Sequence, residues 1–220
     1  TLIPFSFSFS TDISNNINKT ILFLSVVFIT YGLYRALDLI WVCDDIYITF
    51  RYVDNFLQGY GIVYNAGERV EGYTHFLWFL LLSFFRLFKL ELSTISIFLG
   101  LLSYIGIIYL FFTISRKNEN KKRFYIPFTA LALSVNYDFA LWATGGLETM
   151  FYTFLISLVF YTYFFSEMNE SKKLLLSGLL LALACMTRPD AVIFYIYANF
   201  LILIWKFFTH KTFKELIIKL

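Results

Sequence analysis

The chain has 220 residues, of which 59% are hydrophobic, 22% aromatic and 15% charged, and its net charge is +3. Soluble domains carry roughly 25% charged residues, and a single soluble core of this length could not bury the 28 Phe side chains of this chain. The composition predicts an all-α, polytopic membrane protein. The small net charge argues against nucleic acid as a partner.

About six spanning helices are expected, because roughly 30 Å of hydrocarbon requires about 20 apolar residues. A polar segment, 1–19, comes first. The expected spans then follow at 21–43, 94–114, 125–142, 151–165, 174–186 and 192–208. Residues 75–88 are apolar but too short to span, so they are expected to form a juxtamembrane or re-entrant helix.

Basic loops predict the orientation, because Lys and Arg concentrate on the cytoplasmic side. Residues 116–123 carry five basic residues and one acidic residue. This places 44–74, the first outer loop, together with 136–148 and 188–190, on the outer face. No linker or repeat interrupts 20–220, which predicts one transmembrane catalytic-type domain. The chain starts without Met and stops just after an apolar helix, as expected for the N-terminal part of a longer chain.

Two adjacent carboxylates, Asp44 and Asp45, open the first outer loop and are the catalytic candidates. Charge is costly at a membrane, so such residues suggest function. Asp45 is also the predicted N-cap of an amphipathic helix that ends before Gly59. That structural role explains one carboxylate but not two. Asp44 would lie at the unfavourable negative end of the preceding helix dipole, so we expect at least one of the pair to be catalytic.

For most of the other polar residues on the outer face, an ordinary structural role competes with a functional one. The segment with Glu68, Arg69 and Glu71 follows a β-like stretch at 62–64 and could be an ordinary solvated turn. Glu148 lies in the first turn of the next helix, where the dipole alone would favour an acid. Pro189 and Asp190 suit a helix start. Arg188 has no such structural explanation and is a natural partner for phosphate or carboxylate.

Four motifs resemble one family, the GT-C-type integral-membrane glycosyltransferases similar to the mycobacterial terminal arabinofuranosyltransferase and its bacterial relatives. They are Asp-Asp-Ile-Tyr-Ile-Thr-Phe-Arg-Tyr at 44–52, Gly-Ile-Val-Tyr-Asn-Ala-Gly-Glu-Arg-Val-Glu-Gly-Tyr-Thr at 61–74, Ala-Thr-Gly-Gly-Leu-Glu-Thr at 143–149 and Thr-Arg-Pro-Asp at 187–190. The resemblance covers roughly residues 20–208. Members are usually longer than this chain.

The resemblance implies inverting transfer of a sugar from a polyprenyl-phosphate donor to a cell-envelope glycan, lipid or protein acceptor. The reaction would take place on the outer face of the bacterial cytoplasmic membrane. Asp44 matches the general-base position best and Asp45 second. No cofactor is certain; the lipid-linked sugar donor is a substrate, and a divalent cation is possible but has no support in the sequence. The implied substrate-binding residues are Arg51, Glu68, Arg69, Glu71, Tyr73, Glu148, Arg188 and Asp190.

A non-enzymatic alternative is a membrane transporter or a structural subunit of an envelope complex. Transporters place ionisable groups near the bilayer midplane in broken helices. Here the charges lie at the expected outer surface, apart from Arg35 and Asp38, which can pair across one helical turn. The sequence also has no Walker, GxGxxG, HExxH or CxxC pattern. The charge distribution therefore favours the enzyme.

Overall fold

The structure, a computed structural model, describes residues 11–70, 72–117 and 126–209, and every regular element there is helical. Glu71, most of the basic loop 116–123 and residues beyond 209 lie outside the described residues. No strand occurs within these ranges, so the β-like assignment of 62–64 is wrong. In chain order the elements are α1 (Thr11–Asp38), α2 (Ile46–Leu57), α3 (Phe76–Leu87), α4 (Leu92–Lys117), α5 (Phe128–Val135), α6 (Tyr137–Trp142), α7 (Thr149–Phe160), the π-helix η1 (Tyr161–Phe165), α8 (Glu170–Thr187) and α9 (Ala191–Thr209).

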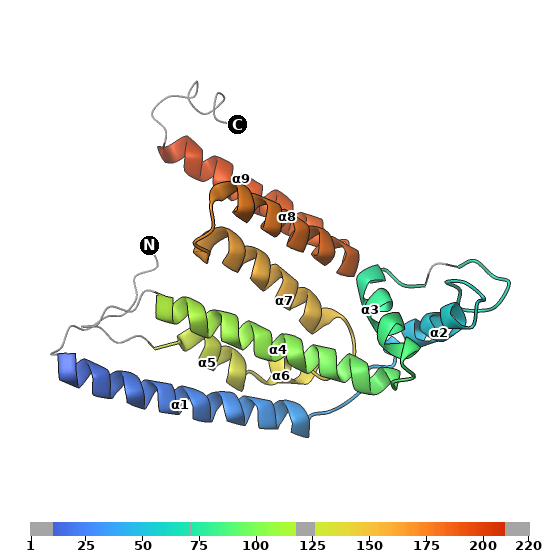
Figure 1. Ribbon diagram of the computed structural model, residues 1–220, viewed down its shortest axis with the longest axis horizontal. Coiled ribbons are helices and arrows are strands. Elements are labelled where there is room, and N and C mark those ends of the chain that lie inside the picture. The colour runs from blue at the N-terminus through green and yellow to red at the C-terminus, as the bar shows by residue number, and fades with distance from the viewer. Residues whose placement is uncertain (1–10, 71, 118–125, 210–220) are drawn as a thin grey trace.

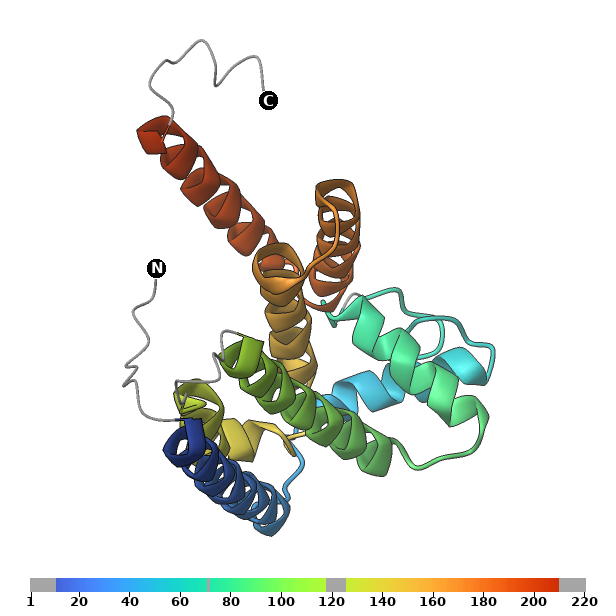
Figure 2. The same cartoon turned by 60° about the vertical axis from the view of Figure 1, so that its left-hand side comes forward.

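The longer helices run back and forth between two ends of the molecule (Figure 1). α1 packs on α5, α4 packs on α7, and α7 packs on α8. α2 and α3 lie against each other at one end, away from the middle of the bundle (Figure 2). The same end carries the turn 143–148 and the α8–α9 junction, and we call it the loop end. The three candidate outer loops therefore meet at one end.

α2 forms because its apolar residues repeat at helical spacing. Ile46, Phe50 and Val53 are buried, and they pack in one cluster with Trp78 and Phe79 of α3. The amphipathic helix predicted after Asp45 is thereby confirmed. The short helix expected at 75–88 is also present as α3.

α1 ends earlier than predicted, at Asp38 instead of residue 43. The predicted Arg35–Asp38 pair forms across its last turn, with 2.9 Å between Nη1 and Oδ2. Residues 40–43 then leave the helix without regular structure. Asp44 is therefore well beyond the end of α1, and the expectation that it faces that helix dipole is wrong.

The expected span at 125–142 is two short helices, α5 and α6, because Asn136 breaks it. Asn136 has an extended backbone, and its side chain accepts a hydrogen bond from the Phe139 amide at 2.8 Å. That bond caps α6 in the manner typical of Asn. The polar interruption noted in the sequence is thus a helix boundary.

Two helical segments within the described ranges are long and apolar enough to cross a membrane, Asn18–Asp38 with 21 residues and Leu92–Arg116 with 25. Elsewhere, large apolar side chains such as Leu175 of α8 and Ile193 of α9 are exposed. Exposed apolar surface of this kind fits a lipid environment. The number of crossings stays a prediction.

Candidate active site

The segment before the carboxylate pair is fixed by residues about one hundred positions later in the chain. Three hydrogen bonds join 39–43 to 141–145. The Trp41 indole donates to the Leu141 carbonyl at 3.0 Å, the Thr144 hydroxyl to the Leu39 carbonyl at 3.2 Å, and the Cys43 amide to the Gly145 carbonyl at 3.0 Å. The turn therefore positions the start of the first loop.

The first part of the turn, 143–146, is packed tightly against α4. A Cβ atom on Gly100 would lie 2.3 Å from the Ala143 carbonyl oxygen. Gly146 has a φ of 82°, a conformation that favours glycine. This glycine-rich motif therefore acts as a structural support for the loop end.

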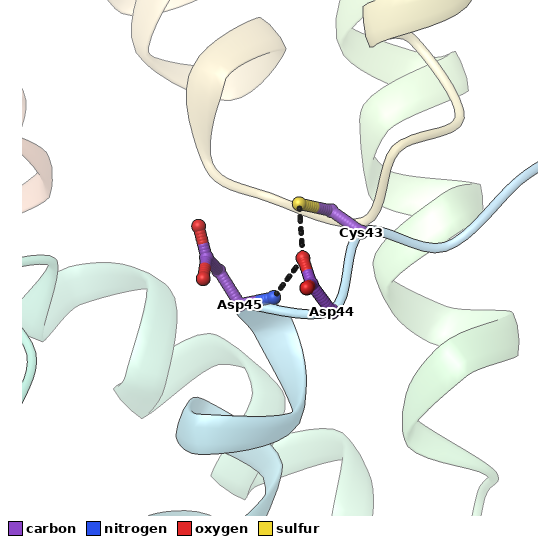
Figure 3. A group of neighbouring side chains, drawn as sticks. All are labelled: Cys43, Asp44 and Asp45. Carbon is purple, nitrogen blue, oxygen red and sulfur yellow. Dashed lines mark hydrogen bonds between the residues drawn. The ribbon is translucent and has the colours of Figure 1, made fainter.

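The carboxylates of Asp44 and Asp45 are both exposed, and their contacts are local (Figure 3). Asp44 Oδ1 accepts a hydrogen bond from the Asp45 amide at 3.1 Å and lies 3.6 Å from Cys43 Sγ. Asp45 occupies the position before α2, but its side chain makes no capping hydrogen bond. The predicted capping contact is therefore wrong, and capping does not occupy the Asp45 carboxylate.

Ligand atoms of Cys43, Asp44 and Asp45 all lie within 4.8 Å of one another, close enough to surround one cation. Burial raises the pKa of the Cys43 thiol, the Asp45 backbone opposes this through a hydrogen bond, and the two carboxylates raise the pKa further. A thiol must lose its proton to bind a metal, and Ca²⁺ and Mg²⁺ prefer oxygen ligands. The trio is therefore poorly suited to a metal, and we assign none to it.

A second group, the Glu148 cluster, consists of Thr49, His75, Glu148, Tyr152, Arg188 and Asp190. Glu148 stands just before α7 and is only 7% exposed. Its Oε1 lies 3.7 Å from Arg188 Nη1, and its Oε2 lies 3.6 Å from His75 Nδ1. Arg188 Nε also bonds Asp190 Oδ1 at 3.3 Å. Three of the predicted binding residues therefore meet here.

Two contacts complete the cluster. Thr49 Oγ1 and His75 Nε2 are 2.6 Å apart, and the Arg188 guanidinium lies 5.7 Å from the centre of the Tyr152 ring. Within the described part of the chain, Glu148 Oε2 and the Tyr152 hydroxyl are buried without a hydrogen-bond partner. Buried polar atoms without partners are rare, and they mark sites that a further group can complete.

Thr49, His75 and Tyr152 are the cluster residues that the sequence did not single out, and His75 is the one whose side chain lies beside the Glu148 carboxylate. Burial lowers the pKa of His75 most, Glu148 opposes this and Arg188 adds to it. The imidazole is therefore neutral at pH 7. Its only signal in the sequence is its place directly after the 61–74 motif, which says nothing about its partners.

The other predicted binding residues belong to the first outer loop, 44–74, in the sequence. Arg51 donates to the Tyr64 carbonyl, Glu68 accepts from the Asn65 amide group, and Arg69 is exposed. The Tyr73 ring lies 5.8 Å from the His75 ring and so borders the cluster. Glu71 is outside the described residues. The structure thus joins Glu148, Arg188 and Asp190 but leaves Arg51 and Glu68 with local partners.

A helical membrane protein with ionisable residues gathered at one end is the class that the fold and site define. Residues 75–220, about two thirds of the chain, match the family of dolichyl-phosphate-mannose-protein mannosyltransferases, and the chain belongs to that family. No curated protein and no solved structure matches the chain. The protein is therefore a membrane glycosyltransferase of GT-C type.

The matched range begins at His75 and includes Glu148, Arg188 and Asp190, whereas Asp44 and Asp45 precede it. The predicted GT-C class is thus confirmed. The narrower likeness to the arabinofuranosyltransferase group remains a prediction.

Proposed function

We propose that this protein transfers a sugar from a polyprenyl-phosphate donor to a cell-envelope glycan, lipid or protein, with Asp44 as general base. One observation carries the proposal. The exposed Asp44–Asp45 pair and the Glu148 cluster occupy the same end of the bundle, with 39–43 bonded to 141–145 and Glu148 directly after that turn. The chemistry needs a carboxylate that an acceptor can reach and a fixed cation for the phosphate, and this end of the bundle carries both.

The reaction displaces phosphate from the sugar. The acceptor hydroxyl attacks C1 as the Asp44 carboxylate takes its proton. The new C1–O bond forms while the bond from C1 to the phosphate oxygen breaks, and its electron pair leaves with the polyprenyl phosphate. Asp44 is exposed and can approach a hydroxyl within hydrogen-bond distance, which a general base requires. Asp45 is the second candidate for this role.

Arg188 is the best-placed cation for the departing phosphate. Its side chain is 40% exposed, so a ligand can reach it, while the buried Glu148 and the exposed Asp190 both pair with it. A cation fixed before the reaction stabilises developing charge without reorganising. Arg51 and Arg69 are also exposed and could contact the same phosphate. Glu68, Tyr73 and Glu148 are the candidates for sugar hydroxyls.

We assign the loop end to the outer face of the bacterial cytoplasmic membrane, with six crossings. The helices that reach the loop end alternate with those that leave it (Figure 1). α4 leads away from the loop end and finishes with Arg116 and Lys117, the first two residues of the basic segment. α3 has only 12 residues and does not count as a crossing.

Cysteine labelling tests this topology. In a variant with Cys43 and Cys185 replaced by Ser, new cysteines at Ala66 and Leu90 should both react with an impermeant thiol reagent from outside. Ala66 precedes α3, Leu90 follows it, and both residues are exposed. Gly72 is less suitable for a new cysteine, because a Cβ atom there would lie 2.8 Å from the Tyr52 hydroxyl oxygen. Protection of position 90 alone would make α3 a crossing and reverse the orientation of everything after it.

Transfer assays test the activity itself. Membranes with and without the protein are given a panel of radiolabelled polyprenyl-phosphate sugars, and label in the envelope fraction is counted. Asp44→Asn should lower the transfer by roughly 100-fold or more, and Asp138→Asn, which changes an exposed acid elsewhere on the chain, should not. Transfer that is equal with and without the protein for every donor would overturn the proposal.

A further inference from the structure

Three side chains from separate elements form a chain of polar contacts that ends on Glu148. Thr49 lies in α2 and is fully buried, His75 precedes α3, and Glu148 precedes α7. Thr49 Oγ1 is 2.6 Å from His75 Nε2, and His75 Nδ1 is 3.6 Å from Glu148 Oε2. Nδ1 faces a carboxylate, which can only accept, so the proton of a neutral imidazole belongs on Nδ1 although the contact is longer than a hydrogen bond. Nε2 then accepts from the Thr49 hydroxyl.

We propose that His75 is a positioning residue, a neutral imidazole with its proton on Nδ1 that Thr49 orients and that in turn orients Glu148. The inference rests on the proposed function, in which Glu148 contacts the sugar and Arg188 the phosphate. Thr49 is too deeply buried to meet a lipid-linked substrate. The contacts therefore act on the substrate only through Glu148.

Positioning by His75 matters because one oxygen of the Glu148 carboxylate has no hydrogen-bond partner within the described residues. Oε2 is buried and has no hydrogen-bond partner in the described ranges, and a contact of 3.6 Å is too long to count as one. Such contacts are often long without substrate and shorten when it binds. A sugar hydroxyl that donates to Glu148 would close the cluster, with His75 preventing the carboxylate from turning away.

Several groups face His75 and determine its charge. Burial and Arg188 lower its pKa, and Glu148 raises it. The Tyr73 ring lies beside the imidazole, while the Tyr152 ring and Asp190 contact Arg188. The imidazole is therefore neutral at pH 7 and takes a proton only below 6.5, the ordinary pKa of histidine.

Protonation of His75 should weaken the site. A protonated imidazole could no longer accept a hydrogen bond from Thr49 and would compete with Arg188 for Glu148. Transfer should therefore fall as the pH drops below 6.5.

Nitrogen-15 NMR of labelled histidine in the detergent-purified protein tests the tautomer without any activity measurement. His210→Gln removes the signals of the only other histidine of the chain. A neutral imidazole with protonated Nδ1 is expected at pH 7. Thr49→Ser should preserve that pattern and Thr49→Val should disturb it. A proton on Nε2, or identical spectra in the Ser and Val variants, would overturn the proposal.

Transfer rates of His75 variants test the consequence. Asn can place an amide donor near the Nδ1 position, so His75→Asn should keep most of the activity but lose its decline at low pH. His75→Ala should lower transfer about 10-fold, as expected for loss of a hydrogen bond to a charged group. If the transfer rate of both variants declines at low pH as it does in the unmodified protein, the role of His75 is overturned. The proposed function would still stand in that case, provided that Asp44→Asn is inactive. The expected NMR pattern without transfer from any donor would instead overturn the function and leave the Nδ1 tautomer and the Thr49–His75 hydrogen bond established.

Discussion

The carboxylates of Asp44 and Glu148 lie at the same end of the molecule in opposite surroundings. Among the residues that the structure describes, the exposed Asp44 carboxylate contacts its neighbours in sequence, Cys43 and Asp45. Glu148 is 7% exposed and lies close to His75, which precedes α3, and to Arg188, which follows α8. The contrast suggests a division of labour. The exposed carboxylate can accept a proton from an incoming acceptor, while the buried one holds other groups in place.

The largest effect should follow from changing the exposed carboxylate. Asn keeps the size and most hydrogen bonds of Asp44 but cannot accept a proton. Asp44→Asn should lower transfer by roughly 100-fold or more, with normal expression and donor binding. Asp45→Asn, measured beside it, identifies which of the two is the base. Full activity in both single variants and in the double variant would remove catalysis from this pair.

Arg188 should be nearly as sensitive. Removing one electrostatic contact to the developing charge costs on the order of 100-fold in rate. Arg188→Lys should already be costly, because Lys cannot reproduce the planar fork that reaches Glu148 and Asp190 together. Single-turnover rates at saturating donor measure the effect. Unchanged turnover in Arg188→Ala would make Arg188 a structural residue at the end of α8.

A mutation in α4 tests whether the turn 143–146 supports the Asp44–Asp45 pair and the Glu148 cluster. Gly100→Ala would place a methyl group 2.3 Å from the Ala143 carbonyl oxygen and should destabilise the protein by about 1–3 kcal/mol, as overpacking does. Gly178→Ala in α8 is the matched control, because its Cβ would meet nothing within 4 Å. Thermal unfolding in detergent should separate the two. Equal melting temperatures would show that the turn moves freely.

The smallest expected effect is on stability at low pH. The pKa of His75 is lowered in the folded protein, so below pH 6.5 the unfolded chain binds more protons than the folded one. Folding stability should therefore decrease as the pH falls through the range between the folded value and 6.5. His75→Asn should remove that part of the dependence. A parallel decline of melting temperature in both proteins would assign it to other groups.

Local patterns predicted much of the fold. Apolar spacing gave α2 and the bounds of α3 to within a residue, and Asn136 marked a real boundary, although within an expected single span. The early end of α1 was not predictable, because apolar residues continue beyond Asp38. Their exit from the helix is supported by hydrogen bonds to 141–145. Local sequence carries no trace of such a distant partner.

In the site, too, local patterns were predictable from the sequence and distant contacts were not. Charge alone pointed to Glu148, Arg188 and Asp190, because ionisable groups are costly near lipid. His75 and Thr49 escaped notice because a lone histidine and a threonine on an amphipathic helix are ordinary. Their meaning appears only when α2 and α3 pack together and bring the two side chains within 2.6 Å. Contacts of that kind belong to tertiary packing.

The hydrogen bonds between 39–43 and 141–145 also bear on how the protein is made. A ribosome completes the Asp44–Asp45 pair long before it reaches Gly145, and Arg188 comes later still. A nascent chain that has inserted only its first helices carries the acidic pair without the turn that positions it. Catalytic competence would then begin only once the later helices have entered the membrane, which separates insertion from reaction in time.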